Sequence, residues 1–176
     1  MSIGDSAILN ELSDVNLFKS KINNSNFSYS TMMGSLSESD FVNVNFVGSI
    51  FDQCLLSWAR INGCNFSKCK FIVKMNDAKC EGCCFISVVF KNSSSGFEYG
   101  GRRVSFVNCD FTNAIFDKIT FRASRFLNCT FTNAKFKSCD LRGARFEGGI
   151  LPSAEQFVHM DVPEQSLDGS KGGDNL

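Results

Sequence analysis

The chain has 176 residues, enough for one domain with a sizeable core, and 19 of them are Phe whereas only 2 are Pro and 1 is Trp. Its 18 basic and 18 acidic residues balance, which excludes a bulk electrostatic attraction to nucleic acid or to a membrane. The charge is nevertheless unevenly spread, because residues 101–151 carry 9 basic and 4 acidic groups whereas residues 152–176 carry 1 and 5.

The first residues, MSIGDSAILNELSD, lack the basic and apolar regions of a signal peptide. No apolar run approaches the roughly 18 residues of a membrane helix. The sequence contains nine Cys, and without a secretory signal these are typical of reduced thiols. We therefore expect a cytoplasmic protein that does not associate with membranes.

From Leu12 to Leu151 a large apolar residue recurs at every fifth position, which is the period of neither a helix nor a strand. There are 27 such centres, and a small residue stands two positions before most of them. The period slips by one residue near Gly34 and near Lys74, and it is interrupted after Phe90. Each unit therefore points one large and one small side chain inward, and the other three positions are mostly polar.

Because a unit of five with two inward residues cannot continue straight, the chain must turn a corner in every unit. Successive corners make coils, and stacked coils pair their backbones through parallel ladder hydrogen bonds. The two slips predict local bulges, and the segment Asn92–Arg102, which lies outside the pattern, predicts a loop that projects from the coils.

The units SCDLR (138–142), NCDFT (108–112) and NCTFT (128–132) resemble the pentapeptide-repeat family. This resemblance implies an all-β fold, a right-handed quadrilateral parallel β-helix with four units per coil, over residues 1–151. It also implies a possible function, because the best-understood members are similar to duplex DNA in width and charge and protect DNA gyrase or topoisomerase from inhibitors. The Phe-rich core of this chain looks like theirs.

Residues 152–162 predict a short C-terminal helix, with a capping box formed by Ser153 and Gln156. Phe157 and Met160 would lie on one face of this helix and cover the last open coil. We expect residues 163–176 to form a disordered tail.

No catalytic residue, cofactor site or metal site is predicted. Seven cysteines occupy the small inward position and Cys80 occupies a centre, which is typical of small buried residues. The pair Cys80 and Cys83 has C-x-x-C spacing, but a zinc site needs four ligands, and the single His, His159, is far away in the sequence. We therefore predict a protein that is not an enzyme.

The candidate binding residues lie outside the repeated inward positions. They are the loop aromatics Phe97 and Tyr99, the arginines Arg102, Arg103, Arg122, Arg125, Arg142 and Arg145, and Trp58. Residues twenty apart should stack, so that Arg122 lies beside Arg142 and Arg125 beside Arg145. The alternatives are a solvated face of mixed charge for the arginines, aromatic rings that fold back onto the rod, and a Trp58 that covers the slip near Gly34.

The favoured function is a non-enzymatic scaffold that binds another protein through its outer faces and its loop. One alternative is a DNA mimic that binds a type II topoisomerase. The basic residues of 101–151 and the polar C-terminal tail both argue against this alternative. Another is a bacterial secreted effector or its recognition domain. We expect no direct binding of nucleic acid, and a monomer or weak dimer.

Overall fold

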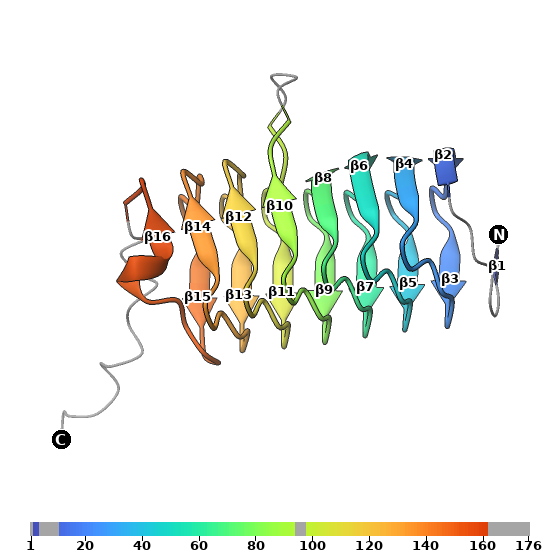
Figure 1. Ribbon diagram of the computed structural model, residues 1–176. Coiled ribbons are helices and arrows are strands. Elements are labelled where there is room, and N and C mark those ends of the chain that lie inside the picture. The colour runs from blue at the N-terminus through green and yellow to red at the C-terminus, as the bar shows by residue number, and fades with distance from the viewer. Residues whose placement is uncertain (1, 4–10, 94–97, 162–176) are drawn as a thin grey trace.

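The structure is a computed structural model that describes residues 2–3, 11–93 and 98–161. In it the chain winds into a rod of stacked four-sided coils (Figure 1). The predicted all-β, right-handed parallel β-helix is confirmed. Within the described residues no helix is long and apolar enough to cross a membrane.

Two sides of the rod are parallel eight-stranded sheets, in which each strand pairs with the strand one coil before and after it. We call the side made by the odd-numbered strands the odd-strand face and the other the even-strand face. The odd-strand face contains β1 (Ser2–Ile3), β3 (Lys21–Asn23), β5 (Asp40–Val42), β7 (Arg60–Asn62), β9 (Lys79–Glu81), β11 (Ser105–Val107), β13 (Arg125–Leu127) and β15 (Arg145–Glu147). The even-strand face contains β2 (Glu11–Asn16), β4 (Thr31–Ser35), β6 (Ile50–Leu55), β8 (Lys70–Lys74), β10 (Val89–Lys91), β12 (Ile115–Asp117), β14 (Lys135–Lys137) and β16 (Phe157–Val158).

The other two sides are held by ladders of single β-bridges. The asparagine face is defined by the bridged residues Asn26, Asn45, Asn65, Cys84, Asp110, Thr130 and Ile150. The arginine face is defined by the bridged residues Lys74, Gly100, Thr120 and Asp140, and it takes its name from the arginines two positions after the last three of these. These four sides are the four units of one coil.

Phenylalanine rings fill the interior in parallel stacks that run along the rod. One stack contains Phe27, Phe46, Phe66, Phe85, Phe111 and Phe131, and its ring centroids are 4.9 to 5.6 Å apart. A second contains Phe51, Phe71, Phe90, Phe116, Phe136 and Phe157, at 4.5 to 5.1 Å. All these rings are buried, so the five-residue period of the sequence is the spacing at which successive units place a large side chain in the core.

The two slips appear as register shifts between neighbouring strands of the even-strand face. The strand β6 has six residues, whereas β4 and β8 on either side of it have five. The residue of β6 without a counterpart in β4 and β8 is Gln53, and its φ of +53° is the left-handed corner conformation that recurs two residues after most centres. The predicted irregularities are therefore present, and they arise because β4 and β8 each have one residue fewer than the regular β6.

The predicted C-terminal helix is wrong in extent. A single 3₁₀ turn, η1 (Ala154–Gln156), carries the expected capping box with Ser153, and the backbone then becomes extended at Phe157. Phe157 pairs with Phe136 in β14 and stacks on its ring at 5.0 Å. The side-chain amide of Gln156 donates to the carbonyl oxygens of Phe131 and Ala134, both at 2.7 Å. Phe157 thus continues the aromatic stack as one more centre, since a longer helix would remove its ring from this position.

Candidate interaction site at the loop and the arginine face

After β10 the chain leaves the rod, and the described residues on either side of 94–97 extend away from the coils (Figure 1). The coil resumes at Gly100, which forms bridges to Lys74 and Thr120 and donates from its backbone N to Val73 O at 2.7 Å. The return point is therefore two residues earlier than the predicted loop boundary at Arg102. Phe97, predicted as a loop anchor, lies outside the described residues.

Tyr99 folds back onto the rod and is only 4 % exposed. Its hydroxyl donates to Gln53 Oε1 at 3.3 Å, which ties the end of the loop to β6. The backbone pairing places Tyr99 at the small inward position and Gly101 at the centre, so that the large and small residues of this unit are exchanged. The prediction of Tyr99 as an exposed aromatic anchor is therefore wrong, and the alternative of a ring that folds back is correct.

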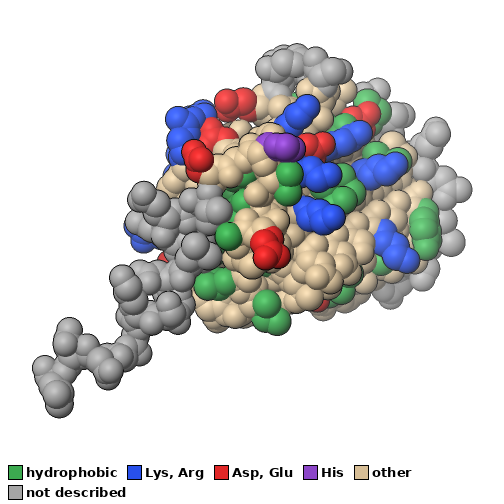
Figure 2. Space-filling model, turned by 60° about the vertical axis from the view of Figure 1, so that its left-hand side comes forward, with side chains coloured by type: hydrophobic (Ala, Val, Ile, Leu, Met, Phe, Trp, Pro, Cys, Tyr) green, Lys and Arg blue, Asp and Glu red, His purple; other side chains and the backbone are tan. Residues whose placement is uncertain are grey.

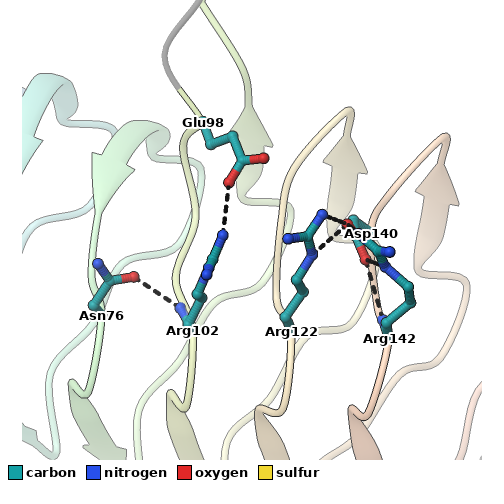
Figure 3. Close-up of polar contacts among 6 residues, drawn as sticks. All are labelled: Asn76, Glu98, Arg102, Arg122, Asp140 and Arg142. Atoms are coloured by element: carbon teal, nitrogen blue, oxygen red, sulfur yellow. Dashed lines mark hydrogen bonds and ion pairs between the residues drawn. The ribbon is translucent and has the colours of Figure 1, made fainter.

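Arg102, Arg122 and Arg142 lie on successive coils of the arginine face (Figure 3). Arg142 binds Asp140 through two hydrogen bonds, Nε to Oδ1 at 3.0 Å and Nη2 to Oδ2 at 2.8 Å. Arg122 binds the same carboxylate from the neighbouring coil, with Nε 2.5 Å from Oδ2. Arg102 reaches back to Glu98 beside the loop, with Nη2 3.4 Å from Oε2. Asp140 therefore holds two of the three guanidinium groups in fixed positions.

The second predicted row lies on the odd-strand face, where Arg125 and Arg145 are opposite each other in the β13–β15 ladder. Arg125 makes an ion pair with Glu147 at 2.8 Å, and Arg103 makes one with Asp77 at 2.7 Å. With the residues that the structure describes, Arg145 makes none. The predicted stacking is confirmed, but neighbouring carboxylates neutralise most of the arginine charge, a feature that counting charges along the sequence did not reveal.

Comparisons with known proteins agree with this geometry. A family model described as "Pentapeptide repeat region" matches residues 102–170, and one described as "Pentapeptide repeats (8 copies)" matches residues 39–72. The chain belongs to the pentapeptide-repeat family.

Solved pentapeptide-repeat structures resemble the chain in fold alone. A trypsin-treated form of QnrB1, a plasmid-mediated fluoroquinolone resistance protein, is 17 % identical with a TM-score of 0.40, and the match covers 86 % of this chain and 77 % of that one. HetL, which is involved in heterocyst differentiation regulation in the cyanobacterium Nostoc sp. strain PCC 7120, is 11 % identical with a TM-score of 0.32, over 80 % and 84 %. The comparison with curated proteins found no match.

The carboxyl group of Asp140 has a pKa well below its usual value, because the hydrogen bond from Arg142 and the contact with Arg122 favour the charged form over the cost of burial. A folded-state pKa below the unfolded value near 3.8 gives stability that is fully present above pH 3.8 and is lost as the pH falls through the folded-state pKa. We therefore expect Asp140→Asn to flatten the acid limb of a stability–pH curve below pH 3.8. The measurement is urea unfolding from pH 2 to pH 7, and an acid limb as steep as that of the unmodified protein would contradict the assignment.

Trp58 points outward, as predicted, with 60 % of its surface exposed. It lines a groove of about 610 Å³ that lies on the first coils of this pentapeptide-repeat rod. Ser20 and charged side chains from neighbouring coils form the rest of the groove, and its lining contains two ion pairs, Lys19 to Glu38 at 3.3 Å and Arg60 to Asp40 at 2.6 Å. An exposed Trp beside a bidentate Arg pair is a typical interface anchor.

The cysteines are free, and all except Cys84 are buried. Burial raises the pKa of Cys54 and Cys69 to about 12 and that of Cys139 to about 11, so these three thiols stay protonated at neutral pH. Among the described residues there is no group of three or more His, Cys, Asp or Glu side chains that could hold a metal ion. The inward cysteines thus fill the small positions of the repeat.

Proposed function

We propose that this pentapeptide-repeat protein is a non-enzymatic scaffold that binds another protein through its outer faces and its loop. One observation carries the proposal: stacked Phe rings fill the described core, whereas the charged side chains are held in rows on the outside. A solenoid with this division of residues has its variable chemistry on its surface and presents it at fixed spacing.

The arginine face beside the loop is the part of this surface best prepared for a partner. Asp140 fixes the guanidinium groups of Arg122 and Arg142, so less side-chain entropy is lost when a partner binds them. Arg is enriched in the centres of protein interfaces, where its planar fork pairs with carboxylate and carbonyl oxygens. Tyr99, held by Gln53, fixes the point at which the loop meets this face.

The DNA-mimic alternative requires a continuous acidic row. On the four faces described here the acidic residues are either paired with Arg or Lys, as Asp40, Asp77 and Asp140 are, or isolated, as Asp110 is on the asparagine face. No feature of the described surface therefore favours binding to a type II topoisomerase, and the second assay below tests this alternative directly.

The test compares three forms of the full chain as baits for cross-linking to proteins of the source cell. The first is the unmodified protein, and the second is Arg102→Ala/Arg122→Ala/Arg142→Ala. The matched control, Ser67→Ala/Thr132→Ala, changes the asparagine face. We expect a partner that the unmodified protein and the control capture equally and that the arginine variant loses by at least about tenfold.

A parallel assay measures supercoiling by DNA gyrase under a fluoroquinolone with and without each form. Protection that persists in the arginine variant would replace the proposed site with another face. A partner captured equally by all three forms would contradict the arginine face as the binding site.

A further inference from the structure

The even-strand face presents a second basic surface that the arginine pattern did not reveal. Its outward positions carry Lys70 in β8, Lys91 in β10, and Lys135 and Lys137 in β14, and Lys118 directly follows β12. Figure 2 shows Lys and Arg side chains gathered with hydrophobic ones along one side of the rod. We call the five lysines together with the apolar residues between them the lysine surface.

The lysines differ from the arginines in their pairing. None of the five makes an ion pair with any residue that the structure describes, whereas Arg60, Arg102, Arg103, Arg122, Arg125 and Arg142 all do. One acidic residue, Asp117, stands at an outward position of β8, β10, β12 and β14, and a second, Asp52, lies in the neighbouring strand β6. The lysine surface therefore has a net charge of +3 that its own carboxylates do not neutralise through direct pairs.

Apolar side chains share one row of the ladder with two of these lysines. Ile50, Lys70, Val89, Ile115 and Lys135 follow one another on successive coils. Ile50 is 37 % exposed, and Val89 and Ile115 are half-buried. Coils stack about 4.8 Å apart, so this row extends about 19 Å, the span of roughly six residues of an extended chain.

We propose that the lysine surface binds an acidic segment of another protein, one in which Asp or Glu side chains are interspersed with apolar side chains. The carboxylates would pair with the lysines, and the apolar side chains would cover the row that contains Val89 and Ile115. The lysines and the apolar residues of the row would then both contact the partner, as in a protein interface with an apolar centre and a charged rim.

A phosphate backbone fits this surface less well than a protein does. Asp117 stands between Lys91 and Lys137 in the ladder, where it would repel a regular row of phosphates. The Ile and Val side chains would gain nothing from a phosphate. A membrane also fits less well, since Val89 and Ile115 are half-buried in the sheet and do not protrude. The lysine surface is a different side of the rod from the arginine face, so this proposal rests on the scaffold function proposed above but not on the arginine face as its site.

The test uses fluorescence anisotropy with the full chain and a labelled 12-residue peptide of alternating Glu and Leu. We expect saturable binding to the unmodified protein that weakens as salt is raised. A 12-residue poly-Glu peptide should bind at least about threefold more weakly despite its higher charge, because it lacks the apolar side chains. A 12-base-pair duplex DNA and vesicles with 30 % phosphatidylserine serve as the competing classes, and tighter binding of either would overturn the proposal.

Variants then locate the contact. Lys91→Glu/Lys135→Glu/Lys137→Glu should weaken binding of the Glu-Leu peptide at least about tenfold, and Ile115→Ser at least about threefold. Lys21→Glu/Lys79→Glu on the odd-strand face and the triple Ala variant of the arginine face should both stay within about twofold.

Equal thermal midpoints would confirm that the variants are folded, and the triple Lys→Gln variant replaces the Glu variant if that one is not. No binding to the unmodified protein would overturn the proposal, and so would binding that the lysine variants leave unchanged. Binding that appears only after residues 162–176 are removed would also overturn it, because the occupant would then be the chain's own acidic C-terminal segment.

Discussion

Replacing Phe116 by Ala is expected to lower the free energy of unfolding by about 3–5 kcal/mol, which is the usual cost of a Phe-sized cavity. The Phe116 ring is fully buried and lies between two parallel neighbours in its stack, Phe136 at 4.5 Å and Phe90 at 5.1 Å. It also meets Phe121 edge to face at 6.1 Å. Because backbone ladders hold the coils above and below at a fixed spacing, the rod cannot collapse to fill the space, so the loss should lie near the upper end of the range.

Urea unfolding followed by circular dichroism measures this effect, and the chain provides a matched control. Phe18 is also a Phe, but 45 % of its surface is exposed, so Phe18→Ala should change the stability by less than about 1 kcal/mol. If Phe116→Ala leaves the free energy of unfolding nearly unchanged, or if the two variants lose equal stability, the Phe116 ring does not contribute to the core as expected. Since contacts in a solenoid are between neighbouring coils, the variant is also expected to unfold less cooperatively.

The fold was predictable because one local rule repeats many times. Each large apolar residue at a centre supports the same prediction of a parallel β-helix, and a single exception such as Cys80 does not weaken that prediction. The slips could be placed near Gly34 and Lys74 because the spacing between centres shortens by one residue there, and the register shifts of β4 and β8 against β6 lie at these points.

The C-terminal end of the repeat and the point at which the repeat resumes after the loop were harder to predict, because local and long-range preferences compete there. A capping box after Pro152 indicates a helix, and the structure does form one 3₁₀ turn there. The aromatic stack then requires a ring above Phe136, and Phe157 supplies it in an extended backbone. In the loop, the exchange of large and small residues between Tyr99 and Gly101 concealed the point at which the repeat resumes.

The candidate site was predictable in position but not in charge. Spacing by twenty residues brought Arg122 and Arg142 together correctly, and it also places Asp140 beside both, but a count by segments treats that carboxylate as one charge among many. The sequence places Lys118, Lys135 and Lys137 near the arginines, but it does not show that they share a surface with Lys70 and Lys91. The slip before Met75 and the long insertion after Lys91 break the spacing of twenty, so Lys70 and Lys135 fall in one row only after the true register is known.

Replacing Gly100 by Ala is expected to cost about 2–5 kcal/mol, the sum of left-handed backbone strain and overpacking. Gly100 has a φ of +105°, and a Cβ atom there would lie 2.1 Å from the carbonyl oxygen of Thr120. That oxygen cannot move away freely, because it accepts the hydrogen bond from Gly101 N at 2.7 Å. The substitution should therefore break the ladder where the loop returns to the rod and weaken the anchoring of Tyr99.

Gly82 is the matched control, since its φ is +59° but a Cβ atom there would have no neighbour within 4 Å. Gly82→Ala should cost only the backbone strain, about 1–2 kcal/mol. Other corners of the rod already accept such a conformation without Gly, as Ala123 does with a φ of +51°. The measurement combines urea unfolding with hydrogen exchange of the Gly101 and Thr120 amides, which should exchange faster in Gly100→Ala and not in Gly82→Ala. Equal destabilisation of the two variants, with no faster exchange at these amides, would mean that the loop is not anchored at Gly100, because the strain at both corners would then be of the same local kind.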